Sequence, residues 1–234
     1  MTAKVQVISV ALLLGVLLLA GCSSHGGSES SRVDEFGKTP LERKKAELLK
    51  QLDRKFENPD VHFELGQLYH SDGMWAEAEY RYNTALSFDP AHRNSQAAMV
   101  KVLADSGDNA KAQLSADIYM NQVCASAEQS LLLAMAFQQQ GLDERALACY
   151  RQALRLAPNS AKIHRQIGYY YLSRNDNVLA KEYLSRSFQI NPNQPEVAGE
   201  LGRLGVAIRI PRKTEKDTKR LDKIVEQSDK QIKP

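Results

Sequence analysis

A period of 34 residues constrains the fold of this chain more than any other feature of its sequence. Pro90, Pro158 and Pro192 lie 68 and 34 positions apart, and Cys124 stands at the missing place between the first two. Fixed-period self-similarity of this length is typical of repeat architectures. Three further columns keep the same interval: Gly73, Gly107, Gly141 and Asn175; Ala78, Ala112, Ala146 and Ala180; Gly66, Val100, Ala134 and Gly168.

Within each period, apolar residues recur at helical spacing. In the first period, residues 63–69 and 78–86 give two amphipathic segments separated by a turn at Gly73. Pro90 then ends the second segment. Glycine takes a positive φ at such a turn without strain, and Asn175 is the best substitute for it in the last period. The sequence therefore predicts an all-α chain of helix pairs.

This pattern resembles the tetratricopeptide repeat (TPR), which has a small residue at position 8, Tyr at 11, Ala at 20 and 27, an aromatic at 24 and Pro at 32. The second repeat is weaker, because Ala116 and Tyr119 exchange its aromatic and small positions. The resemblance implies a right-handed TPR superhelix of about four full repeats. Counted from Pro59, the first repeat supplies Gly66, Tyr69, Ala78, Tyr82, Ala85 and Pro90.

The repeats occupy residues 58–192, in registers 59–92, 93–126, 127–160 and 161–194, and the flanking segments are expected to cap them. Residues 40–57 carry a helical apolar face and resemble an N-terminal capping helix. Residues 193–210 give a C-terminal half repeat, with Pro195 at a plausible first helical position. Solenoids need irregular ends of this kind to cover their terminal repeats.

The last segment, residues 211–234, is a basic tail in which Lys and Arg are interleaved with Asp and Glu. A solvated tail is favoured over a polyanion site. The formal net charge of +3 is also too small to argue for nucleic acid.

The first 21 residues have the features of an export signal. A single early charge, Lys4, precedes an apolar run that is shorter than a membrane-spanning helix requires. Residues 19–22, LAGC, resemble the bacterial lipobox, which implies cleavage before Cys22 and lipidation of its thiol. An ordinary secretory signal followed by a chance cysteine is the alternative. Ser23 fits the family pattern for sorting to the outer membrane.

Residues 22–39 are rich in Ser and Gly and poor in apolar groups, which predicts a flexible tether. Such a tether reaches about 20 to 25 Å from the membrane.

Residues that could carry chemistry have structural explanations. The repeat register places Cys124 and Cys149 too far apart for a disulfide, so both are interpreted as packing residues. His62 and His164 share one repeat position and are interpreted as structural. No protease, hydrolase, nucleotide-binding or metal-binding motif occurs. We therefore expect a non-catalytic protein without a cofactor or metal.

The TPR resemblance also implies a concave protein-binding groove, lined by positions 2, 5, 9, 12 and 13 of each first helix. An amphipathic helix or an extended peptide is the expected ligand. Leu131 could instead belong to the core. The predicted groove residues are Phe63, Gln67, His70, Lys101, Leu131, Met135, Gln138, Arg165 and Tyr169.

Taken with the lipobox, this layout resembles the tight-adherence (Flp) pilus assembly lipoproteins of the TadD type. That resemblance implies a pilotin at the outer membrane, facing the periplasm, whose groove binds a secretin subunit and promotes its localisation and assembly. The alternative is an envelope scaffold that recruits peptidoglycan enzymes or another outer-membrane assembly complex. An enzyme is the third possibility, but the sequence displays no catalytic constellation.

Overall fold

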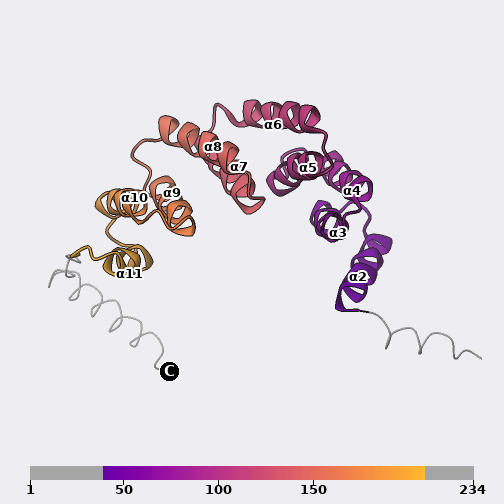
Figure 1. The fold of residues 1–234 in the computed structure, drawn as a ribbon, viewed down its shortest axis with the longest axis horizontal. Helices are drawn as coiled ribbons and strands as arrows, with labels where there is room; N and C mark the ends of the chain where they lie inside the picture. The colour runs from indigo at the N-terminus through magenta and orange to yellow at the C-terminus, as the bar shows by residue number, and fades with distance from the viewer. Residues whose placement is uncertain (1–38, 209–234) are drawn as a thin grey trace, which may run out of the picture. The chain divides into compact units, whose positions relative to one another are not determined.

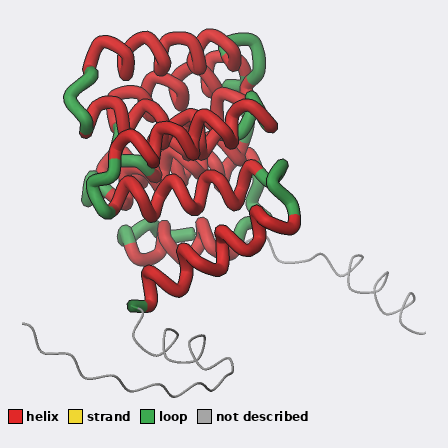
Figure 2. Tube along the Cα trace, turned by 90° about the vertical axis from the view of Figure 1, so that its right-hand side faces the viewer, coloured by secondary structure: helices red, strands yellow, loops and turns green. Residues whose placement is uncertain are grey.

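The computed structural model describes residues 39–208, and residues 1–38 and 209–234 lie outside the described range. The predicted signal, Cys22, most of the tether and the basic tail therefore fall outside it. Helices and connecting loops account for the described chain (Figures 1 and 2). The helices are α2 (Pro40–Arg54), α3 (Pro59–Ser71), α4 (Trp75–Phe88), α5 (Arg93–Asp105), α6 (Asn109–Val123), α7 (Ala127–Gln139), α8 (Asp143–Leu156), α9 (Ala161–Ser173), α10 (Asn177–Ile190) and α11 (Pro195–Arg203).

The helices pack as antiparallel pairs, which confirms the predicted all-α TPR fold. Within the pairs, α3 packs against α4, α7 against α8 and α9 against α10, while α5 also contacts the first helices α3 and α7. The α5–α6 pair is less closely packed than the other three. Its second helix is the one in which Ala116, fully buried, replaces the aromatic residue of the repeat.

Local sequence explains where the helices begin and turn. Asp108, Ser126, Ser160 and Asp176 each accept a hydrogen bond from a backbone N–H in the first turn of the following helix. Asn175 has a φ of 59°, in the left-handed region that glycine occupies in the earlier turns. The prediction that Asn175 substitutes for glycine is confirmed.

The two helices of a pair approach closely where the repeat has a small residue. A Cβ added at Gly66 would lie 2.5 Å from the Tyr82 ring, and one added at Gly168 would lie 2.6 Å from the Leu184 side chain. These glycines therefore leave room for the large residue of the facing helix.

Buried residues form three clusters. The central one extends from Ala78 to Tyr170. A smaller one joins Leu48 and Leu52 of α2 to Val61 and Leu65 of α3. A third joins Leu184 to Val197 and Leu201, so α11 covers the last pair. No helix within residues 39–208 has both the length and the apolar character needed to cross a membrane.

The fourth position of every repeat holds a buried polar residue that bonds to the end of the preceding segment. His62 Nε2 lies 2.9 Å from the Phe56 carbonyl oxygen, and His164 Nε2 lies 2.9 Å from that of Pro158. The structural interpretation of both histidines is confirmed.

The other two repeats reproduce this bond with different side chains. Gln96 Nε2 donates to the Pro90 carbonyl at 2.8 Å, and Ser130 Oγ donates to the Val123 carbonyl at 2.9 Å. We call His62, Gln96, Ser130 and His164 the anchor residues.

The two cysteines in the described range are free thiols with different surroundings. Cys149 is buried, as its predicted packing role requires, and burial raises its pKa to about 12. Cys124 is exposed at the C-cap of α6. Its predicted packing role is wrong, because the helix ends there and turns the side chain out of the core.

Candidate protein-binding groove

The predicted groove residues lie on the first helices α3, α5, α7 and α9. All but one of them keep partly or fully exposed side chains. The exception is Leu131, which is 1% exposed and belongs to the central cluster. A side chain buried in the core is not available to a ligand, so the assignment of Leu131 to the groove is wrong.

A polar cluster connects the C-terminal ends of α3 and α5. His70 Nε2 lies 2.9 Å from Asp105 Oδ2, and Lys101 Nζ donates to Asp105 Oδ1 at 2.6 Å. Burial favours a raised pKa for Asp105, but the hydrogen bonds from Lys101 and His70 outweigh it and lower the pKa. The structure thus brings two predicted groove residues together through a carboxylate that they share.

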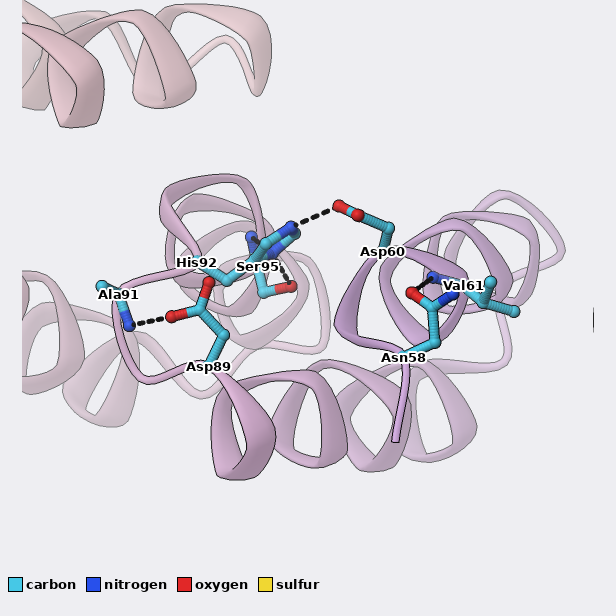
Figure 3. Close-up of polar contacts among 7 residues, drawn as sticks. All are labelled: Asn58, Asp60, Val61, Asp89, Ala91, His92 and Ser95. Carbon is cyan, nitrogen blue, oxygen red and sulfur yellow. Dashed lines mark hydrogen bonds and ion pairs between the residues drawn. The ribbon is translucent and has the colours of Figure 1, made fainter. Parts of the chain in front are cut away.

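A second polar junction connects the N-terminal ends of the same helices (Figure 3). His92 caps α5, because its Nδ1 accepts the Ser95 backbone N–H at 3.2 Å. Its Nε2 lies 3.0 Å from Asp60 Oδ1, in the first turn of α3. Asn58 caps α3 through the Val61 N–H. The two helix starts are thereby held in register.

Phe63 lies beside this junction and is only partly available to a ligand. Its ring centroid is 5.5 Å from that of His92 and 6.0 Å from that of Tyr82. Gln67, one turn further along α3, is exposed.

Met135 lines a pocket of 240 Å³ between α5 and α7, together with residues that are not among the predicted groove residues. Leu132 is 38% exposed there, and Arg93 and Asn94 contribute from the start of α5. Asn94 could have been predicted from the sequence, because it occupies position 2 of its repeat, which is one of the groove positions. Arg93 and Leu132 lie outside the five groove positions and carry no comparable signal.

Arg93 is held at this pocket by neutral oxygens. Its Nη1 donates to Gln96 Oε1 at 2.8 Å, and its Nη2 donates to Gln129 Oε1 at 3.1 Å. Burial lowers its pKa, an effect that the charge of Asp89 opposes. The guanidinium therefore stays cationic beside an apolar surface, an arrangement suited to an acidic or amphipathic partner.

Of the remaining predicted residues, Gln138 and Arg165 form hydrogen bonds within the chain, and Tyr169 packs against the third hydrophobic cluster. Gln138 accepts a hydrogen bond from the Tyr150 hydroxyl at 2.5 Å, so its side chain is committed within its own repeat. Arg165 donates to Gln194 Oε1 at 3.4 Å. Tyr169 packs against the third cluster, and burial raises its pKa. The surface left for binding is thus apolar and amide-rich, with cations at its edges.

The described residues contain no group of His, Cys, Asp and Glu side chains placed to hold a metal ion.

Comparisons with known proteins place the repeat in its family. A family model described as TPR repeat matches residues 135–175. The human protein O-mannosyl-transferase TMTC1 (Homo sapiens) is 25% identical over 182 residues, which cover 74% of this chain but only 19% of TMTC1. This chain therefore spans less than a fifth of the length of that relative.

Solved structures give fold-level likenesses of low similarity. MamA is 20% identical, with 62% of this chain and 80% of MamA covered and a TM-score of 0.37. YrrB, described as a TPR protein with an unusual peptide-binding site, is 19% identical, with coverages of 73% and 85% and a TM-score of 0.37. PilF of Pseudomonas aeruginosa is 24% identical, with coverages of 62% and 67% and a TM-score of 0.36.

The matched segment runs from α7 through α8 into α9, so it spans parts of two successive 34-residue periods, and that period corresponds to the helix pairs of the structure. Residues 135–175 match the tetratricopeptide repeat, and the described helix pairs have the corresponding fold, which is the architecture of a protein-interaction scaffold.

Proposed function

We propose that this chain is a non-catalytic, lipid-anchored TPR protein of the bacterial envelope that acts as a pilotin. Its groove binds a segment of a secretin subunit, and the anchor brings the complex to the outer membrane, on the periplasmic side. The Tad/Flp pilus is the machine that the sequence resemblance favours. Residues 19–22, LAGC, support the anchor, because they offer a thiol directly after the small residues of an export signal.

The observation that carries the binding role is the open surface around Met135. A pocket lies there between two first helices, lined by three apolar and four polar residues, and its guanidinium, that of Arg93, has no carboxylate among the pocket residues. Tyr169, at the corresponding position of α9, is also partly exposed. Aromatic and Met side chains supply much of the contact area in peptide grooves, so an amphipathic segment fits this surface.

Charge substitutions on the two faces of the repeats test the groove. We expect Met135→Glu and Tyr169→Glu to reduce secretin multimers in the outer membrane, because a carboxylate there would have to be desolvated on binding. Leu114→Glu and Val178→Glu are matched controls, since these side chains are 61% and 77% exposed on the second helices α6 and α10. Unchanged multimers in the groove variants, at normal protein levels, would contradict the proposal.

The anchor is tested separately by Cys22→Ala. Loss of the thiol should abolish acylation, measured by incorporation of labelled palmitate. Retention of the label would show that Cys22 is not the lipidated residue.

Crosslinking in intact envelopes distinguishes the pilotin from the alternative scaffold. Capture of a secretin through a crosslinker placed at Asn94 supports the pilotin. Capture of a murein hydrolase without secretin would favour recruitment of peptidoglycan enzymes.

A further inference from the structure

A second pocket, separate from the groove residues, lies between the end of α6, the start of α7 and the middle of α8. Its volume is 310 Å³, at the lower end of the range of small-ligand sites. Met120, Val123, Ser130 and Cys149 are among its lining residues, and they give it a largely apolar floor. The third repeat thus has a hollow at its anchor residue, Ser130.

The fourth repeat has a hollow in the same register, which allows a direct comparison. There His164 takes the place of Ser130, and Tyr183 takes the place of Cys149. The two rings contact each other, with centroids 6.0 Å apart. The third repeat therefore has two small side chains where the fourth has two aromatic rings.

The two hollows also differ in charge. Arg151 and Arg155 line the hollow of the third repeat, and no acidic residue does so among those described. The fourth repeat has one acid and one base, Glu182 and Arg186. In order along the helix, Ala148, Arg151, Gln152 and Arg155 of the third repeat correspond to Glu182, Ser185, Arg186 and Gln189 of the fourth.

Neutral groups hold Arg155, one of the two arginines of the pocket, in place. Arg155 donates to Gln152 Oε1, and Gln152 Nε2 donates to the Cys124 carbonyl oxygen at 2.6 Å. Within residues 39–208, neither Arg151 nor Arg155 forms an ion pair with a carboxylate. The lining of this largely apolar pocket thus includes two arginines that form no ion pair with a described carboxylate.

We propose that this pocket binds the C-terminal residue of a partner polypeptide that ends in an aliphatic amino acid. Its carboxylate pairs with Arg151 and Arg155, and its side chain contacts Met120 and Val123. A C-terminal residue carries both groups on one α-carbon, so one small pocket accommodates them. In an extended internal segment, successive side chains point to opposite faces, which separates an acidic side chain from the apolar side chain beside it.

The proposal is tested on the full chain with N-acetyl-L-leucine, followed by NMR of the backbone amides. We expect saturable shifts at the amides of Ser130 and Cys149. N-acetyl-L-leucinamide, which lacks the carboxylate, should bind at least about tenfold more weakly, because a charge-assisted hydrogen bond contributes about 1.5 to 3 kcal/mol. N-acetylglycine, which lacks the side chain, should also bind more weakly.

Variants connect the binding to this pocket. Arg151→Gln and Arg155→Gln should each weaken N-acetyl-L-leucine by about tenfold, because each removes a charge-assisted bond. Arg186→Gln in the fourth repeat is the matched control and should leave the affinity unchanged. A thermal melt of each variant checks that it is folded.

Three results would overturn the proposal. One is the absence of saturable shifts with N-acetyl-L-leucine, and another is equal binding of the amide. The third is a loss of affinity in Arg186→Gln as large as that in Arg151→Gln. None of these measurements uses a secretin, so they succeed or fail independently of the proposed pilotin role.

Discussion

At the scale of single residues, the anchor position shows how one hydrogen bond is made by different chemical groups. The imidazole of His62, the amide of Gln96 and the hydroxyl of Ser130 all reach a carbonyl at the end of the preceding segment. A carbonyl oxygen only accepts, so the His62 ring must carry its proton on Nε2. Its Nδ1 is buried and has no partner in the described chain.

His62 should therefore make the stability of the protein depend on pH. Burial lowers its pKa below 6.5, and this outweighs the opposing bond to Phe56. A lowered folded pKa means that the unfolded chain binds more protons, so stability is full above pH 6.5 and falls as the pH drops through the folded value.

The measurement is denaturant unfolding across that pH range. His62→Gln should keep the hydrogen bond to the preceding carbonyl, as Gln96 does. It should also reduce the loss of unfolding free energy as the pH falls below 6.5. An unchanged pH profile in His62→Gln would show that the loss of stability comes from other groups.

Asn175 gives a second residue-scale prediction, because its φ of 59° is unfavourable for residues with a Cβ. Asn175→Gly should keep or slightly raise the unfolding free energy. Asn175→Ala should lower it by about 1 kcal/mol, because alanine lacks the side-chain hydrogen bonding that helps asparagine tolerate this region. Thermal or urea unfolding checks the difference, and equal stabilities of the two variants would contradict it.

For single residues, the sequence predicted those features that depend only on a residue's position in the repeat. Asn175 and the two histidines follow from their positions in the 34-residue period. The groove assignment of Leu131 failed, because its repeat position does not report whether its side chain is buried in the central cluster. Arg93 was missed for a similar reason, since its pocket needs residues from two first helices at once.

At the scale of elements, small residues decide how closely the helices of a pair approach. Gly66 faces the Tyr82 ring, whereas Gly199 in α11 has no atom near its missing Cβ. Substitution by alanine should therefore lower the unfolding free energy at Gly66 and raise it at Gly199.

Gly66→Ala is expected to cost about 1 to 3 kcal/mol of unfolding free energy, because the new methyl group overpacks the α3–α4 interface. Gly199→Ala should instead stabilise by up to about 1 kcal/mol through helix propensity. Urea unfolding of both variants tests this. A neutral Gly66→Ala would mean that the Tyr82 ring moves aside at little cost.

The second repeat shows which element-level features the sequence could indicate. The exchange of Ala116 and Tyr119 marked it as irregular, and α6 is indeed less closely packed against α5. The pocket beside α6 was not foreseen, because it combines the end of one repeat with the small Ser130 and Cys149 of the next. Each of these residues is unremarkable alone, and only their arrangement in space creates the hollow.

At the scale of the described chain, buried contacts are divided among three clusters rather than gathered in one. In repeat proteins, stability is approximately a sum of local terms, so the ends can open while the centre stays folded. We expect amide hydrogen exchange to be slowest in α5, α7 and α8 and faster in α2 and α11.

Leu201→Ala is the variant that tests this division. Its side chain is 1% exposed in the third cluster, so truncation should cost about 2 to 5 kcal/mol locally. Protection should fall in α10 and α11 and remain unchanged in α5. Leu133→Ala, in the central cluster, is the control and should lower protection throughout. A uniform loss of protection in Leu201→Ala would indicate one cooperative unit.

The direction of the anchor bonds has a consequence for a chain that emerges from its N-terminus. Every anchor residue bonds to a carbonyl that precedes it in sequence, and Gln194 does the same before α11 through the Ser187 and Asn191 carbonyls. The bond from each anchor residue to a preceding carbonyl needs no later segment, although Gln96 also donates to Gln122 in the following helix. Each junction can therefore close as soon as the next helix has left the ribosome or the export channel, which allows the repeats to fold one after another in the order of synthesis.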